Sequence, residues 1–192
     1  MATRSNRASG FTLIELLVVM FVIGVVASVG VLSMSQLGSR NLEQTARQLA
    51  SQIELAREHT LLTGQALSIG VGTEGLVILE RQWIDDTRVT WIPIERGPLG
   101  PHDFRQHGLQ PRLYVDGRRS GLRESPEHNR IAINGSGHIE PFELILEHPD
   151  GRSGFVLRLE RGQPLQAFEH PPPAGGEPRR LLAKRPGRPD SR

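Results

Sequence analysis

The sequence predicts an α+β protein in which one long N-terminal α-helix packs on antiparallel β-sheets. Three features predict this class: an apolar run from Phe11 to Leu32, a polar stretch from Gln36 to Thr63 that keeps helical periodicity, and a series of short strand-like segments after Gly64. A helix that buries one stripe against antiparallel sheet is the simplest arrangement of these elements. A chain of 192 residues has room for one such domain and some additional segments.

The apolar run FTLIELLVVMFVIGVVASVGVL contains a single charged residue, Glu15, and has the roughly 20 residues that a bilayer core requires. We therefore expect residues 11–34 to form a transmembrane half of the helix. Arg4 and Arg7 precede the run and nothing comparable follows directly, which predicts a cytoplasmic N-terminus. A secretory signal fits less well, because its apolar core has only about 7 to 15 residues and a small-residue cleavage site follows it directly. An ordinary single-pass anchor stays open as an alternative, but it gives Glu15 no role.

Glu15 is the residue of this run for which a positively charged partner is expected. A carboxylate at the bilayer centre costs about 2.5 to 3.5 kcal/mol on insertion scales, so a cation is expected nearby. If the chain is cut after Gly10, Phe11 becomes an N-terminal amine one helical turn from Glu15. The amine of a neighbouring subunit could also reach this carboxylate, which would set the axial register between packed helices.

Residues 35–64 are predicted to be the amphipathic half of the same helix. Apolar residues recur at spacings of three and four, charged residues occupy the opposite faces, and Gly64 supplies a C-terminal stop. The predicted buried stripe consists of Leu42, Ala46, Leu49, Ile53, Ala56 and Thr60.

Residues 65–170 are predicted to form a β-rich globular domain, because short apolar segments alternate there with turn residues. The expected strands are 66–71, 76–83, 88–94, 113–115, 130–133, 142–147, 155–160 and 165–168. Turns are expected at 73–75, 134–137 and 149–151, the last two between antiparallel neighbours. Trp83 and Trp91 lie on neighbouring strands and are expected in the core or in cross-strand pairs, with a partner surface as the less favoured alternative.

Two segments lack a regular apolar pattern. Residues 95–130, rich in Gly and Pro, are expected to be a long exposed loop, and residues 171–192 a disordered, basic, Pro- and Gly-rich tail. Six basic tail residues could contact phosphates, but no aromatic residue lies between them for base stacking. A solubilising or membrane-surface tail is preferred, and nucleic acid is not the expected partner. The six residues are Arg179, Arg180, Lys184, Arg185, Arg188 and Arg192.

No residue pattern predicts a catalytic, cofactor or metal site. The chain has no cysteine, which excludes disulfides and thiolate ligands. His102 and His107 are the closest histidine pair, yet no acidic ligand cluster accompanies them, so both are expected to be solvent-exposed. Asp85 and Asp86 are expected in a solvated turn, and Ser136 in a hairpin turn and not in a nucleophile motif. We therefore expect neither an enzyme nor a cofactor.

Three segments of the chain resemble pilin-like protein families. Gly10 followed by FTLIELLVVMFVIGVVA resembles the class III prepilin signal of type IV pilins and type II secretion pseudopilins, over about residues 4–34. The segments ELAREHTLLTGQALSIGV (54–71) and IAINGSGHIEPFELILEHPDGRSGFVLR (131–158) are similar to the H-type minor pseudopilins of type II secretion. Together these resemblances cover about half of the chain.

The resemblance implies a pilin-like fold and a structural role in export of folded proteins across the outer membrane. It implies that residues 1–10 are a leader cut after Gly10 by a prepilin peptidase, that Phe11 is N-methylated, and that Glu15 acts in filament assembly. The implied partners are the major and other minor pseudopilins and the inner-membrane secretion platform, with the C-terminal domain in the periplasm. The alternative within the same superfamily is a minor pilin of a type IV pilus that binds DNA through the tail.

Overall fold

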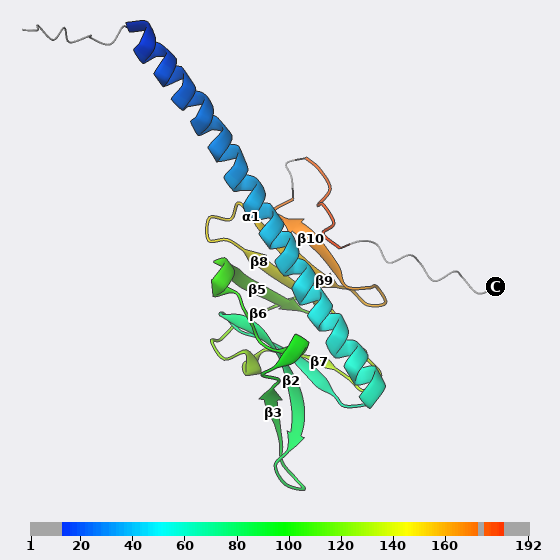
Figure 1. The fold of residues 1–192 in the computed structure, drawn as a ribbon. Helices are drawn as coiled ribbons and strands as arrows, with labels where there is room; N and C mark the ends of the chain where they lie inside the picture. Colours follow the sequence, from blue (N-terminus) through cyan, green and yellow to red (C-terminus); the bar gives the residue numbers. More distant parts are fainter. Residues whose placement is uncertain (1–12, 173–174, 183–192) are drawn as a thin grey trace, which may run out of the picture. The chain divides into compact units, whose positions relative to one another are not determined.

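The computed structural model describes residues 13–172 and 175–182, and the side chains of residues 26–39 lie outside that description. The chain divides into two units, residues 1–41 and 42–192. One helix, α1 (Leu13–Thr63, 51 residues), contributes to both units, and the strands follow it (Figure 1).

Helix α1 ends where the sequence predicts. Gly64 has a φ of +70°, a left-handed conformation that glycine adopts without strain, and its N–H donates to the Thr60 carbonyl at 2.8 Å. The Thr63 hydroxyl donates to the His59 carbonyl at 2.8 Å. These bonds satisfy two carbonyls of the last turn, so Gly64 is the residue that stops the helix.

The first sheet is antiparallel and has the order β3-β2-β1-β7, with β4 added beside one end of β2. Its strands are β1 (Leu67–Val71), β2 (Gly75–Trp83), β3 (Val89–Pro93), β4 (His102–Asp103) and β7 (Arg130–Ile133). Strand β1 pairs with β2 no farther than Glu80, so the last residues of β2 pair with β3 alone. The β2–β3 hairpin therefore extends past β1, at the bottom of Figure 1.

The second sheet is also antiparallel and has the order β10-β9-β8-β5-β6. Its strands are β5 (Gln110–Val115), β6 (Arg118–Ser120), β8 (Phe142–Glu147), β9 (Gly154–Leu159) and β10 (Gln166–His170). The predicted turn at 149–151 joins β8 to its neighbour β9, which is confirmed. The turn at 134–137 closes a single antiparallel bridge between Ile133 and Ile139, and the chain then continues to β8 in the other sheet. The expected antiparallel pairing is therefore met by one bridge only, and not by β7 and β8.

Residues 42–63 of α1 and the inner faces of both sheets enclose one core. Five members of the predicted helical stripe are buried and the sixth, Leu42, is partly buried against the same cluster. In the second sheet a row of paired residues runs across β5, β8, β9 and β10 into this core. The row is Leu113, Leu144, Leu157 and Ala167.

The expectation of a long exposed loop over 95–130 is wrong. This segment holds β4, β5 and β6 and three short 3-10 turns, η1 (Gly97–Leu99), η2 (Arg105–His107) and η3 (Pro126–His128). Phe104 within it is fully buried, and its N–H donates to the Glu74 carbonyl at 2.8 Å. Strand β4 has only two residues and is held by Gly75 and Leu76 of β2. Such long-range pairing leaves no local periodicity, and the Gly and Pro content concealed it.

The disorder expected for residues 171–192 is wrong for part of the segment. The Leu181 N–H donates to the Ala167 carbonyl at 2.8 Å, and the Glu169 N–H donates to the Arg179 carbonyl at 2.9 Å. Leu181 is buried in the core cluster. This segment therefore covers the outer edge of β10, while residues 183–192 lie outside the described residues.

Candidate assembly site

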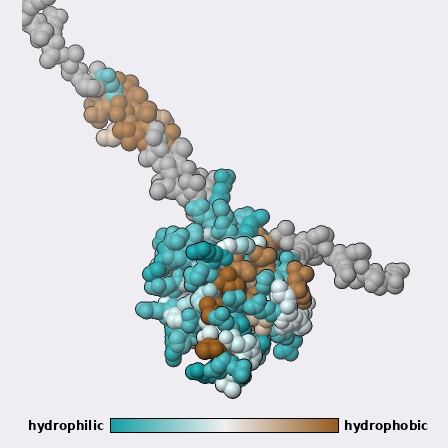
Figure 2. Space-filling model, turned by 60° about the horizontal axis from the view of Figure 1, so that its bottom comes forward, coloured by the Kyte–Doolittle hydropathy of each residue, from teal (hydrophilic) through white to brown (hydrophobic). Residues whose placement is uncertain are grey.

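The first described turns of α1 expose apolar side chains on every side. All residues from Leu13 to Val25 are exposed, and the exposure of the large apolar side chains runs from 48% at Val19 to 83% at Leu13. Figure 2 shows an almost unbroken brown surface on this stretch. A helix that is apolar all round is covered by lipid or by other protein. This surface therefore needs a covering that the described residues do not supply.

Glu15 is the only charged residue between Leu13 and Val25 and lies in the first turn of α1. A carboxylate in the first turn of a helix is favoured by the helix macrodipole, by about 0.3 to 1 kcal/mol at an exposed position. The predicted cleavage and methylation positions, Gly10 and Phe11, lie outside the described residues. Their roles, and that of Glu15 in assembly, stay predictions.

Across the described residues, none of the helices combines the length and the apolarity that a bilayer crossing requires.

The predicted transmembrane half, residues 11–34, lies partly outside the described residues. Residues 11 and 12 are not described, and neither are the side chains of residues 26–34.

Residues 42–63 of α1 are fixed to the globular domain by polar contacts as well as by the core. The Gln52 side-chain amide donates to the Gly100 carbonyl, and Arg57 Nε donates to the Gly137 carbonyl at 3.0 Å. Gln52 itself is buried. The last turns of the helix and the sheets therefore form one packed unit.

The two histidines singled out in the sequence do come together. The rings of His102 and His107 stack with centroids 5.6 Å apart and planes 10° from parallel. Both are half-buried, and His102 Nε2 is buried without a hydrogen-bond partner, so the expected solvent exposure is wrong. Burial lowers the pKa of His102, and the nearby His107 lowers it further. Among the described residues, no group of three or more His, Cys, Asp or Glu side chains is placed to hold a metal ion.

The other polar motifs are turns, as expected. Asp85 accepts hydrogen bonds from the N–H groups of Thr87 at 3.0 Å and Arg88 at 2.8 Å. A further bond from the Arg88 guanidinium, together with the Thr87 bonds, holds the pKa of Asp85 below its usual range. The Asn134 side-chain oxygen accepts from both the N–H and the hydroxyl of Ser136, at 3.1 and 2.7 Å.

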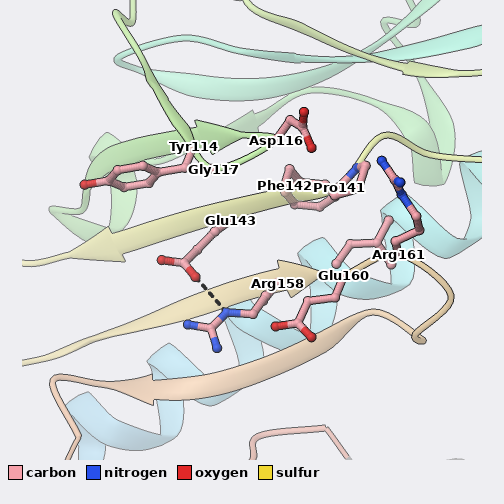
Figure 3. A pocket seen from close by; sticks show the side chains of 10 residues that line it. Tyr114, Asp116, Gly117, Pro141, Phe142, Glu143, Arg158, Glu160 and Arg161 are labelled. Atoms are coloured by element: carbon pink, nitrogen blue, oxygen red, sulfur yellow. Dashed lines mark hydrogen bonds and ion pairs between the residues drawn. The ribbon is translucent and has the colours of Figure 1, made fainter.

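A groove of about 600 Å³ lies on the face of the second sheet opposite the core. Tyr114, Glu143 and Arg158 form a row of paired residues across β5, β8 and β9 on this face. Figure 3 shows that the Glu143 carboxylate meets the Arg158 guanidinium, and Nε donates to Oε2 at 2.6 Å. Glu143 and Arg158 are bonded to each other, which indicates a structural ion pair; Asp116, Glu160 and Arg161 also line the groove.

The basic tail residues that the structure describes contact the rest of the chain. Arg179 forms an ion pair with Glu43 of α1 at 3.3 Å, and the Arg180 guanidinium carbon lies 5.7 Å from the centre of the Phe168 ring. The remaining four candidates, Lys184, Arg185, Arg188 and Arg192, lie outside the described residues.

Of the two positions expected for the tryptophans, the core is wrong for Trp83, which is 60% exposed, whereas cross-strand pairing is confirmed: Trp83 pairs with Val89. Trp91 is half-buried and pairs with Arg81. Trp83 lies three residues beyond Glu80, the last residue of β2 that pairs with β1. On the β1 side of β2, no described strand therefore lies beside Trp83. The sequence signal was the continued apolar character of Trp83 and Ile84 immediately before the Asp85 turn.

The chain is similar to known proteins in sequence and in fold. Residues 5–31 match the prokaryotic N-terminal methylation motif. A type II secretion system protein H from Aeromonas hydrophila is 33% identical over 167 residues, covering 77% of this chain and 85% of that protein. A protein of the same name from Pseudomonas aeruginosa is 29% identical over 156 residues, covering 77% of this chain and 89% of that protein. The solved structure of the minor pseudopilin EpsH from the type 2 secretion system of Vibrio cholerae aligns with a TM-score of 0.51 at 15% identity, covering 66% of this chain and 95% of that chain. This last likeness confirms the predicted α+β fold.

Proposed function

Because the chain belongs to the type II secretion system protein H family, the minor pseudopilins of type II secretion, we propose that the exposed α1 surface from Leu13 to Val25 packs against other pseudopilins in a filament. The observation that carries this proposal is the apolar surface on every side of that stretch, with Glu15 in its first turn. Packing against several helices covers such a surface on all sides, and for a helix that leaves lipid the stabilisation comes from close side-chain packing and not from removal of the surface from water.

The same helix carries the globular domain into the filament. Its residues 42–63 belong to the core, so a displacement of the packed helix displaces both sheets with it. The protein thus acts by assembly and not as an enzyme, and the exported proteins are moved by the growing filament. The energy comes from a cytoplasmic ATPase acting on the inner-membrane platform.

Processing prepares the N-terminus for this packing. A prepilin peptidase cuts after Gly10 and methylates Phe11, and the methylation motif matched at residues 5–31 supports both steps. The new amine at Phe11 then supplies the cation that the Glu15 carboxylate requires in apolar surroundings. The pairing is either within one helix or between neighbouring subunits.

The unassembled subunit is anchored in the inner membrane. The apolar run of residues 11–34 and the preceding Arg4 and Arg7 support a single crossing with a cytoplasmic N-terminus and a periplasmic domain. The major and other minor pseudopilins and the secretion platform are its partners. A type IV pilus minor pilin is not favoured, because the curated relatives are type II secretion proteins.

Replacement of Glu15 tests the proposed packing. Glu15→Val should leave membrane insertion intact and strongly reduce co-purification with the major pseudopilin from the native host. Glu15→Asp keeps the charge and should retain most of the co-purification. Leu16→Val is a control for a change of side-chain shape at the neighbouring position. Unimpaired secretion and co-purification in Glu15→Val would refute the role of the carboxylate. Intact-mass measurement of the same samples checks for a chain that begins at methylated Phe11.

A further inference from the structure

The β2–β3 hairpin carries most of the exposed large apolar side chains in the described part of residues 42–182. Two further ones, Leu61 and Leu62, lie at the end of α1. Figure 2, with the hairpin end of the domain brought forward, shows brown patches among teal on this side. The hairpin residues are Trp83 and Ile84, both 60% exposed, Val89 at 39% and Ile92 at 36%. By the strand register, Trp83 and Val89 lie on one face of the hairpin and Ile84 and Ile92 on the other. Exposed apolar side chains on both faces of a projecting hairpin mark an element that another molecule covers.

The hydrogen bonds of the hairpin fix which backbone groups of β3 point toward β2. The Ile84 N–H donates to the Arg88 carbonyl, and the Ile94 N–H donates to the Ile78 carbonyl, both at 2.9 Å. In an antiparallel pair, residues that bond to the partner strand alternate with residues whose N–H and C=O point the other way. Counting from these two bonds therefore assigns every residue between them.

Thr90 and Ile92 direct their backbone groups to β2, whereas Val89, Trp91 and Pro93 direct theirs to the outer edge. Strand β3 pairs with no other strand in the described part of the chain. The outer edge thus presents two N–H donors and three carbonyl acceptors in strand spacing. Pro93, which has no N–H, ends the donor row. An open edge of this kind is a template for a further strand.

Two arginines lie over the tryptophans of the hairpin. The guanidinium carbon of Arg81 is 5.7 Å from the centre of the Trp83 ring, and that of Arg130 is 5.2 Å from the centre of the Trp91 ring. Neither arginine has an ion pair or a side-chain hydrogen bond within the described residues. Their donors are available to a carboxylate, and the one acidic side chain that lines the adjoining hollow is Glu127.

We propose that the outer edge of β3 binds an extended, carboxylate-bearing strand of another protein. A strand satisfies alternating donors and acceptors together, which a lipid headgroup or a nucleic acid backbone cannot do. Carboxylates at alternate positions of that strand reach Arg81 and Arg130 on the tryptophan face, because side chains on one face of a strand recur every second residue. The proposal does not depend on the role of Glu15.

The probe is the hexapeptide acetyl-(Glu-Val)3-amide, with the same peptide carrying Lys for Glu as the opposite charge. Binding to the full chain in detergent micelles is followed by intrinsic fluorescence, because both tryptophans of the chain lie in this hairpin. Amide exchange by NMR then locates the contact. We expect the Thr90 and Ile92 amides to be protected without peptide, and the Val89 and Trp91 amides to become protected only when the acidic peptide saturates the protein.

Charge and backbone variants separate the two parts of the proposal. Arg130→Glu should weaken the acidic peptide at least about fivefold and strengthen the basic one, whereas Arg119→Glu on β6 should change neither. Val89→Pro removes an outward donor without removing a bond to β2 and should abolish protection at Trp91. Equal affinity for both peptides would overturn the charge argument. Binding without protection of the two outward amides would overturn strand addition, and protection that rises with protein concentration alone would assign the edge to a second copy.

Discussion

Leu181 tests whether the C-terminal segment belongs to the folded domain. Its side chain is 6% exposed within the core cluster, and its N–H donates to the Ala167 carbonyl at 2.8 Å. Leu181→Ala removes buried hydrocarbon worth about 0.8 kcal/mol per CH2 group and leaves a cavity. The expected loss in the free energy of unfolding is about 2 to 3 kcal/mol, at the low end for a buried leucine because the segment lies at the edge of the sheet.

Urea unfolding of the full chain in detergent micelles measures this loss. Fluorescence of Trp83 and Trp91 reports on the first sheet, so a shifted midpoint shows that a change beside β10 destabilises the whole domain. The urea dependence of the free energy should stay unchanged, because the surface exposed on unfolding is nearly the same. Leu62→Ala is the matched control: Leu62 is 87% exposed and its truncation should change stability by less than about 0.5 kcal/mol. An equally small effect of Leu181→Ala would refute the packing of the segment.

Two further changes test the domain. Because burial and His107 lower the pKa of His102 below its ordinary value of 6.5, the unfolded chain binds more protons there, so stability present above pH 6.5 should be lost as the pH falls below it. His102→Gln should reduce this slope in unfolding measured from pH 7.5 to 5.5, and an unchanged slope would contradict it. Gly137→Ala should cost more than the roughly 1 to 2 kcal/mol of an alanine in the left-handed region, because φ is +71° and the new Cβ would also lie 2.7 Å from Leu61 Cγ. Gly117→Ala is the control, because Gly117 has a φ of +75° with open space around it and the change adds backbone strain alone. Equal losses in the free energy of unfolding for the two variants would contradict the clash with Leu61.

The elements that sequence reasoning found are those whose signal is local. Helix α1 and its stop at Gly64 follow from periodicity and from a residue type that tolerates positive φ. Strand β8 was predicted with its observed bounds, 142–147, because its apolar side chains lie in a continuous run between turn residues. The stripe of α1 in the core was predicted for the same reason, since burial of one helical face leaves a spacing of three and four.

What sequence reasoning missed depends on pairing across long separations. Strand β4 exists because β2 offers it two residues, and the segment around Leu181 is ordered because β10 has a free edge. The amino-acid sequence of β4 or of the segment around Leu181 does not by itself show the strand that pairs with it. The exposure of Trp83 likewise depends on where β1 stops pairing with β2, which is at Glu80. The sequence of β2 does not show where its neighbour β1 ends. Large aromatic side chains on paired strands are usually buried, which is why the core was the wrong expectation here.

The two exposed apolar surfaces, on α1 and on the β2–β3 hairpin, differ in their backbone hydrogen bonding. This difference determines which kind of partner can cover each of them. In the stretch of α1 from Leu13 to Val25 the main-chain groups bond within the helix, apart from the first N–H groups, so lipid or other helices can cover it through side-chain packing alone. At β3 the outward groups of Val89 and Trp91 lose water when the edge is covered, and each unpaired buried group costs about 1 to 3 kcal/mol. A helix laid on that edge would leave them unpaired, whereas a strand would satisfy them. Helices that pack on α1, as proposed above, therefore cannot also occupy the hairpin edge, which needs a partner that presents a strand.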